Sequence, residues 1–96
     1  MENRSGVQVN KTYLAEVFIS LKEVVNDPQG LAIRDGLHNL GFDAISGVRT
    51  GKYLRLTVDA ADAGSAERIA LEACEKLLAN TVIEEFRVSV AELATT

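Results

Sequence analysis

The stretch that decides the fold reads Gly47-Val48-Arg49-Thr50-Gly51-Lys52-Tyr53-Leu54-Arg55-Leu56-Thr57-Val58. Gly51-Lys52 separates two runs rich in β-forming residues, at about 45–50 and 52–59. Two such runs on either side of a glycine-containing dipeptide are typical of a β-hairpin, in which glycine supplies the positive φ of a tight turn. We therefore expect a central hairpin that turns at Gly51.

A helical pattern lies upstream of this hairpin. Asp27 has the character of an N-cap, and Pro28 suits the first helical position because its missing N–H would be unpaired there in any case. Apolar residues follow at helical spacing and share one face: Ile33, Leu37 and Leu40. Gly41 is expected to end the helix in the left-handed conformation.

A second helical pattern lies downstream, with Asp62 or Ser65 as its N-cap. Small and aliphatic residues line one face of this helix: Ala66, Ile69, Ala70, Ala73 and Leu77. Alternation of apolar and polar residues predicts two further strands, one from Thr12 to about Lys22 and one around Phe86–Val90.

The element order is therefore β-α-β-β-α-β. It predicts an α+β, ferredoxin-like fold with an antiparallel four-stranded sheet, strands one and three at its centre, and two helices on one face. We expect tails at 1–12 and 92–96 around a domain at 13–91. The second sheet face needs cover, and its apolar or aromatic members are candidates for self-association: Leu14, Phe18, Tyr53 and Thr57.

The length, charge and composition of the chain limit the functions that it can have. The chain has 96 residues, enough for one domain, and a formal net charge of -4, which argues against nucleic acid and anionic membranes as partners. Met1 begins no apolar signal segment, and no apolar run is long enough to span a membrane, so we expect a cytoplasmic protein.

The residues predict no active site in this chain. The one cysteine, Cys74, is expected to be a buried apolar residue, and the one histidine, His38, a solvated one. We find no metal-binding spacing and no nucleotide-binding loop. The glycine- and lysine-containing stretch 47–52 is open to two interpretations, a plain turn or an anion site built from backbone N–H groups.

Several strings, in their order along the chain, resemble one family. They are Leu21-Lys22-Glu23 with Asp27-Pro28-Gln29-Gly30, Leu40-Gly41-Phe42, Val48-Arg49-Thr50-Gly51-Lys52-Tyr53, and the run Cys74–Phe86. This pattern, from about Tyr13 to Val90, is similar to the PurS family, the small accessory subunit of phosphoribosylformylglycinamidine synthase. Thr81 departs from the family pattern, which has proline there, and the tail before Thr12 is longer than usual.

The resemblance implies a non-catalytic role. In that family the small subunit bridges a glutaminase subunit and a larger synthetase subunit, and it assists the passage of ammonia between them. The complex converts formylglycinamide ribonucleotide, glutamine and ATP into formylglycinamidine ribonucleotide, glutamate, ADP and phosphate in de novo purine synthesis. ATP and Mg²⁺ are implied at the synthetase subunit, and no cofactor in this chain. A dimer or higher oligomer is also implied, with room for segment exchange between protomers.

Charged residues near the hairpin and the first helix are candidate partner contacts, because charge orients partners: Lys22, Asp27, Arg49, Lys52 and Arg55. Two other functions remain open on the element order alone. One is a stand-alone regulatory module that binds a small ligand at a dimer interface, as ACT-like domains do. The other, an acylphosphatase-like hydrolase, needs an arginine-bearing loop after strand one, and residues 22–26 contain no arginine.

Overall fold

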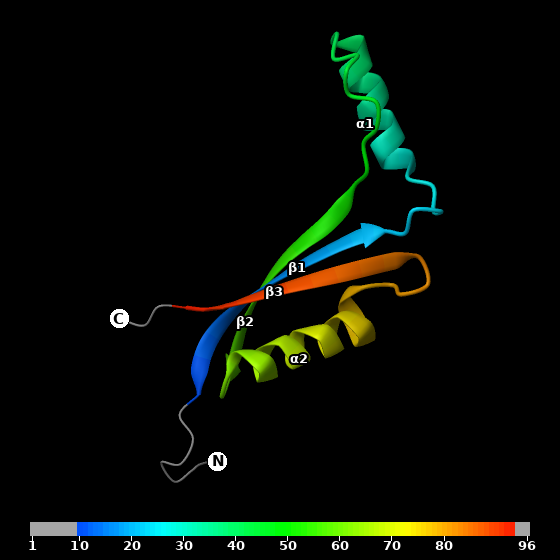
Figure 1. Ribbon diagram of the computed structural model, residues 1–96. Coiled ribbons are helices and arrows are strands. Elements are labelled where there is room, and N and C mark those ends of the chain that lie inside the picture. Colours follow the sequence, from blue (N-terminus) through cyan, green and yellow to red (C-terminus); the bar gives the residue numbers. More distant parts are fainter. Residues whose placement is uncertain (1–9, 94–96) are drawn as a thin grey trace.

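The computed structural model describes residues 10–93. Its regular elements are β1 (Lys11–Leu21), α1 (Pro28–Asn39), β2 (Gly51–Ala60), α2 (Ala63–Ala73), a π-helical turn (Cys74–Leu78) and β3 (Glu84–Glu92). Figure 1 shows a twisted sheet with α2 lying along one face, while α1 projects beyond the end of the sheet. The tails expected at 1–12 and 92–96 lie mostly outside the described residues, and of their described members Lys11, Thr12 and Glu92 belong to strands.

The sheet is antiparallel, with strand order β2-β1-β3. β1 is central and pairs on both sides, for example Val17 with Leu54 of β2 and with Val88 of β3. Alternate residues of β1 are buried, since successive side chains of a strand point to opposite faces. The predicted first, third and last strands are therefore confirmed, and the central place of the first strand is confirmed with them.

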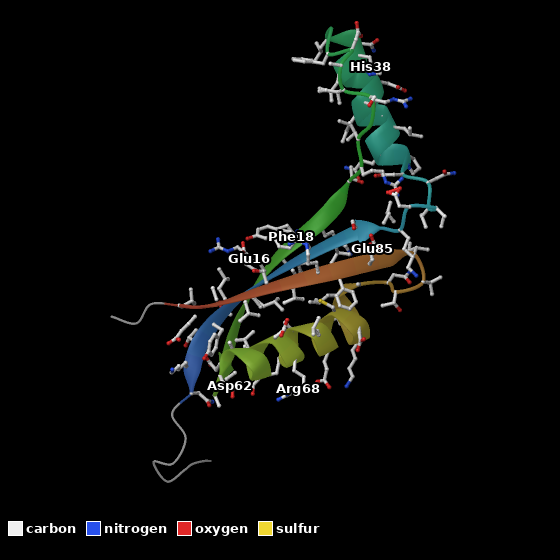
Figure 2. All side chains as sticks on the ribbon, in the orientation of Figure 1. Glu16, Phe18, His38, Asp62, Arg68 and Glu85 are labelled. Carbon is white, nitrogen blue, oxygen red and sulfur yellow. The ribbon has the colours of Figure 1, made fainter. Side chains whose placement is uncertain are left out.

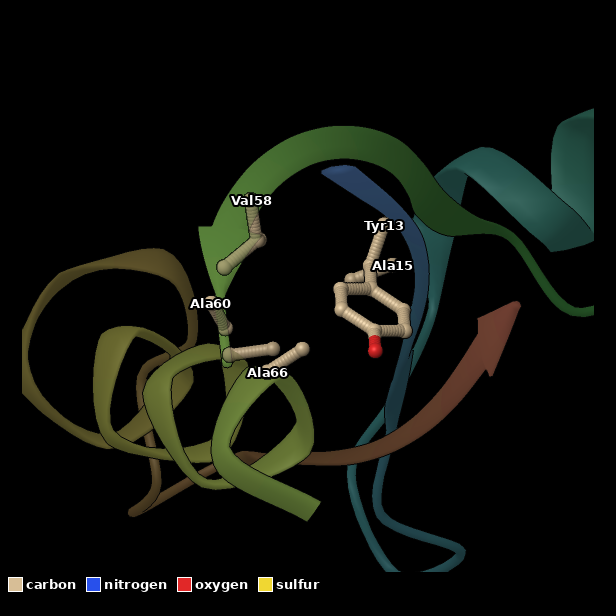
Figure 3. Packing of buried hydrophobic residues seen from close by; sticks show 6 residues of the cluster. Tyr13, Ala15, Val58, Ala60 and Ala66 are labelled. Atoms are coloured by element: carbon tan, nitrogen blue, oxygen red, sulfur yellow. The ribbon is translucent and has the colours of Figure 1, made fainter. Parts of the chain in front are cut away.

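α2 covers one face of the sheet because its small residues allow the helix to approach closely. Ala66 and Ala70 pack against Tyr13, Ala15 and Val58 with almost no exposed surface (Figure 3). A second cluster, around Val17, Ile19 and Cys74, continues the core toward the end of the helix. Burial of such side chains stabilises a fold by about 1.5–3 kcal/mol for each large aliphatic group.

The inner face of the second helix differs from the prediction. Ile69 is 46% exposed and Leu77 is 82% exposed, although both were expected to face the sheet. The chain enters a π-helical turn at Cys74, which has more residues per turn than an α-helix and so rotates the following side chains. As a result Cys74 and Leu78 contact the core, and Leu77 points to solvent.

The predicted four-stranded sheet is wrong, and so is the placement of both helices on one face. Among the described residues the sheet has three strands, because residues 45–50 form no ladder. α1 makes no extensive packing contact with the sheet or with α2. The expected third strand, now β2, consequently lies at an edge of the sheet instead of its centre.

Gly51 explains why the hairpin does not form. Its φ is not positive, so it does not make the expected tight turn, and the chain runs straight through it into β2. A Cβ atom at Gly51 would collide with the carbonyl oxygen of Ile19 on β1. Glycine is therefore required here for the close approach of two strands. Gly41, by contrast, has φ +97° at the end of α1, as predicted.

Candidate functional site

Residues 28–50 form an arm that leaves the sheet and returns to it. α1 carries the chain outward, and residues 40–50 run back beside the helix (Figure 1). His38 of α1 donates a hydrogen bond from Nε2 to the carbonyl oxygen of Ile45, at 2.7 Å, which ties the returning segment to the helix. His38 is half-buried, so the expectation of a solvated histidine is wrong.

The outgoing and returning chains meet at a neck, formed by residues 22–27 and 49–51. Arg49 donates from Nη2 to the carbonyl oxygen of Lys22 at 2.9 Å. A Cβ atom at Gly30 would collide with the carbonyl oxygen of Val48 and with the Asp27 carboxylate, so the first turn of α1 lies directly against the returning chain. The outgoing and returning segments are therefore in van der Waals contact at Gly30 and Val48, and they are hydrogen-bonded at Arg49 and Lys22.

Asp27 is at the centre of the neck, with 4% of its surface exposed. One carboxylate oxygen accepts the N–H of Gly30 at 3.0 Å and so caps α1. The other accepts the N–H of Thr50 at 2.6 Å, and the Thr50 hydroxyl lies 2.9 Å from both oxygens. The carboxylate thus links Asp27 of the outgoing segment to Thr50 of the returning segment, 23 positions later in the sequence.

These hydrogen bonds also fix the charge state of Asp27. The N–H groups of Thr50 and Gly30 hold the pKa of the Asp27 carboxyl below its ordinary value of 3.8, and they outweigh burial, which acts in the opposite direction. Arg49 lowers this pKa further through its positive charge. The group is therefore an anion at neutral pH, and its charge is satisfied inside the neck.

A pocket of about 450 Å³ opens beside the neck, between the ends of β1 and β2 and the start of α1. Lys52 lies on its wall, with Nζ 3.7 Å from a carboxylate oxygen of Glu84. Asp27 and Thr50 also line it, but their polar atoms already bond to each other. The polar side chains of the pocket thus form two separate pairs, Lys52 with Glu84 and Asp27 with Thr50.

The sheet face opposite α2, which we name the open face, gathers aromatic and charged side chains. The rings of Phe18 and Tyr53 are 5.2 Å apart, and the Arg87 guanidinium lies 4.3 Å from the centre of the Phe18 ring. Tyr53 donates its hydroxyl to Glu16 at 2.5 Å. Figure 2 shows Glu16 and Phe18 on this face. Such a cluster of aromatic and arginine side chains is typical of surfaces that bind other proteins.

The hydrogen bond to Glu16 raises the pKa of Tyr53 above its ordinary value of 10.0. The phenol therefore stays protonated at neutral pH and continues to donate. Arg55 is the residue opposite Glu16 in the register of β1 and β2, so the open face carries a negative and a positive charge side by side.

The predicted residues fall into two groups. Lys22, Asp27 and Arg49 belong to the neck, and Lys52 lies on the wall of the adjoining pocket. Arg55 lies apart from them on the open face. The four self-association candidates share the open face, because Leu14 is the partner of Thr57 and Phe18 is the partner of Tyr53 in the strand register.

Sequence reasoning missed three residues of these surfaces: Thr50, Glu16 and Arg87. Thr50 stands in the stretch that opened the analysis, but its bond to Asp27 spans the whole arm and has no local spacing signal. Glu16 and Arg87 could have been found from the strand register, which places both beside Phe18 and Tyr53 once the pairing is known.

The described residues contain no group of three or more His, Cys, Asp or Glu side chains that could hold a metal ion. Cys74 is buried, as predicted, and burial raises the pKa of its thiol above the ordinary value of 9.0, so it is a poor nucleophile. Within residues 10–93, no helix has the length and apolar character needed to cross a membrane.

Comparisons with known proteins agree with one another. The sequence model of PurS, described as phosphoribosylformylglycinamidine (FGAM) synthase, matches residues 14–92. The FGAM synthase subunit PurS of Bacillus subtilis is 46% identical over 81 residues, which are 84% of this chain and 95% of that protein.

Two solved structures from Thermotoga maritima are similar to the whole fold. The purS subunit of FGAM synthase has a TM-score of 0.80 at 29% identity, over 93% of this chain and 100% of that one. A chain in the structure of PurLQS has a TM-score of 0.76 at 32% identity, over 85% of this chain and 98% of that one.

The α+β fold and these relatives together define a small subunit of a larger enzyme. The chain belongs to the PurS family of FGAM synthase subunits. The predicted family, and the predicted status as a subunit of this synthase, are confirmed. The ACT-like alternative is not favoured by these relatives.

Proposed function

We propose that this chain is the non-catalytic accessory subunit of an FGAM synthase complex in the cytoplasm, where it bridges the glutaminase and synthetase subunits and assists ammonia transfer. ATP and Mg²⁺ act at the synthetase subunit, and neither nucleic acid nor membrane takes part. The likeness to a chain in the PurLQS structure of Thermotoga maritima carries this proposal, because it covers 85% of the present chain.

The proposal includes a homodimer that exchanges arms. The arm exposes large apolar side chains, among them Leu40 at 75% and Phe42 at 53%, and its helix makes no extensive packing contact with its own sheet. The outer edge of β2 has no partner strand among the described residues. In a βαββαβ fold that edge is where the second strand pairs. A second copy fits both requirements, because its segment 45–50 can complete the sheet while its α1 lies beside α2.

A single charge on the arm tests the exchange. Phe42→Asp places a carboxylate where the arm would be buried in a partner, and we expect it to convert the dimer into a monomer, since an unpaired buried charge is costly. Leu77→Asp, at a residue that is 82% exposed and lies outside the arm, is the matched control and should remain dimeric. Sedimentation velocity distinguishes the two species. A dimeric Phe42→Asp variant would show that the arm is not the dimer contact.

The open face is the second proposed contact. Leu14, Phe18, Tyr53 and Thr57 would join exchanged dimers into a higher oligomer, and the neighbouring charges of Glu16 and Arg55 would orient the two faces. Lys52 and Arg55 are both exposed, and we propose that these cations also meet the larger subunits.

Reconstitution tests the bridging role. The purified glutaminase and synthetase subunits are assayed for glutamine-dependent formation of formylglycinamidine ribonucleotide with and without this chain. We expect activity to appear only when the chain is added, and ammonia-dependent activity of the synthetase alone to be unaffected. Equal glutamine-dependent activity with and without the chain would contradict the proposal.

A further inference from the structure

The bond between Asp27 and Thr50 does more than helix capping requires. A capping side chain needs one oxygen to accept an N–H of the first turn, and serine serves as well as aspartate. In this chain one oxygen of Asp27 caps α1 through Gly30, and the second reaches across the neck to the N–H of Thr50. The second oxygen therefore connects the outgoing and returning chains, and helix formation does not need it.

This connection matters because the arm has little else to orient it. α1 makes no extensive packing contact with the sheet or with α2, so within one copy the direction of the arm depends on the neck. An arm that swings freely must lose that freedom when it docks on another chain, and the loss weakens binding. An arm already held in one direction has less freedom to lose.

We propose that Asp27 and Thr50 form a latch across the neck, which holds the arm in one direction before two copies meet and thereby sets the affinity of the dimer. This inference rests on the arm-exchanged dimer proposed above. Arg49 supports the latch through its bond to the carbonyl oxygen of Lys22, and Gly30 supports it by allowing the helix to lie against Val48. The sequence left the stretch 47–52 open as a turn or an anion site. Thr50, within this stretch, supplies the side of the latch that lies on the returning segment.

Asp27→Ser removes the latch and keeps the cap, because it retains an oxygen for the Gly30 N–H but is too short to reach Thr50. Thr50→Val removes only the hydroxyl contact of the latch, at almost constant volume, since the Thr50 N–H still donates to Asp27. Thr50→Ser keeps the hydroxyl and is the conservative control. Asp62→Ser makes the same change at the N-cap of α2, where the carboxylate accepts only from nearby Ser65, at 2.7 Å.

The experiment measures the dimer dissociation constant of the full chain by sedimentation equilibrium over a dilution series. We expect Asp27→Ser to raise this constant about tenfold or more, since it leaves the arm to be ordered on association. Thr50→Val should raise it by a smaller factor, because the bond from the Thr50 N–H to Asp27 remains. Thr50→Ser should stay within about twofold of the wild type, because it keeps both the N–H and the hydroxyl that bond to Asp27. Asp62→Ser should do the same, because it changes a cap that lies outside the neck. Amide exchange of Asp27→Ser, followed by NMR, should be faster at Thr50 and unchanged at Gly30.

The outcomes separate the latch from the dimer. A wild-type chain that stays monomeric at every concentration would overturn the exchanged dimer itself. A dimeric wild type with an unchanged constant in Asp27→Ser and Thr50→Val would overturn only the latch. An equal weakening by Asp62→Ser would also overturn the latch, because the effect would then be a general loss of stability.

Discussion

Thr50 contributes two hydrogen-bond donors to the neck, its backbone N–H and its hydroxyl, and both donate to the Asp27 carboxylate. A buried carboxylate is unfavourable unless hydrogen bonds replace the water it has lost. At Asp27 three donors replace this water, since two backbone N–H groups and one hydroxyl surround its oxygens. The charge is therefore a structural part of the neck.

The pH dependence of stability follows from this charge. Because the pKa of Asp27 is lowered in the folded state, the unfolded state binds the proton more readily. The stabilisation is fully present above the ordinary pKa of 3.8 and is lost as pH falls through the lower native value. We expect the free energy of unfolding of Asp27→Asn, measured in urea at constant protein concentration, to fall less steeply with acid than that of the wild type. Parallel curves would contradict this.

Two glycines of α1 should respond in opposite directions to the same change. Gly30→Ala forces a methyl group against the Val48 carbonyl oxygen and the Asp27 carboxylate, and overpacking of this kind costs about 1–3 kcal/mol. Gly36→Ala meets nothing within 4 Å and should stabilise the helix by up to about 1 kcal/mol. Thermal unfolding followed by circular dichroism tests both. A harmless Gly30→Ala would show that the neck is not closely packed.

At the scale of elements, the π-helical turn at Cys74–Leu78 decides which side chains complete the core. Leu78 packs against the cluster of Val17, Ile19 and Cys74, whereas its neighbour Leu77 is 82% exposed. A regular α-helix would have continued the inner face through Leu77. The turn therefore places Leu78 in the core, where a regular helix would have placed Leu77.

Alanine substitution at these neighbours tests the turn. We expect Leu78→Ala to cost about 2–3 kcal/mol of unfolding free energy through the lost contacts and the cavity. Leu77→Ala should cost less than about 0.5 kcal/mol, as is usual at the surface. Urea unfolding measures both. The reverse order of effects would mean that the helix continues regularly and that Leu77 is the core residue.

Local signals explain which elements were predictable. Alternation identified three strands, and the caps Asp27 and Asp62 and the terminator Gly41 marked the helix ends correctly. The missing strand at 45–50 could not be recognised as such, because a segment rich in β-forming residues has the same sequence pattern whether or not it pairs within its own sheet. The extended conformation of Gly51 reflects its close approach to Ile19 of β1, a contact across the sheet that has no local sequence signal.

The candidate site was predictable in its parts and not in its arrangement. Lys22, Asp27, Arg49 and Lys52 were selected for their charge, and the structure brings them to one place. Their partners could not be foreseen, since Arg49 bonds a backbone carbonyl and Lys52 bonds Glu84 from the far end of the chain. The charge of Asp27 is thus satisfied within the neck and Lys52 is paired with Glu84, whereas Lys22 contributes only its backbone carbonyl oxygen.

The whole molecule is elongated, with a radius of gyration of 18.6 Å. A compact domain of this length has a radius of gyration of about 12–13 Å. The difference reflects an arm that stands away from the sheet, visible in Figure 1. A small chain that leaves apolar surface exposed in this way gains stability by association. Its shape therefore suits a subunit whose role is to hold other chains together.

Native mass spectrometry of the full chain, alone and mixed with the glutaminase and synthetase subunits, tests this role most directly. We predict a homodimer or a multiple of it for the chain alone, and a single assembly that contains all three kinds of subunit for the mixture. A chain that stays monomeric and separate from both larger subunits would contradict the adaptor role.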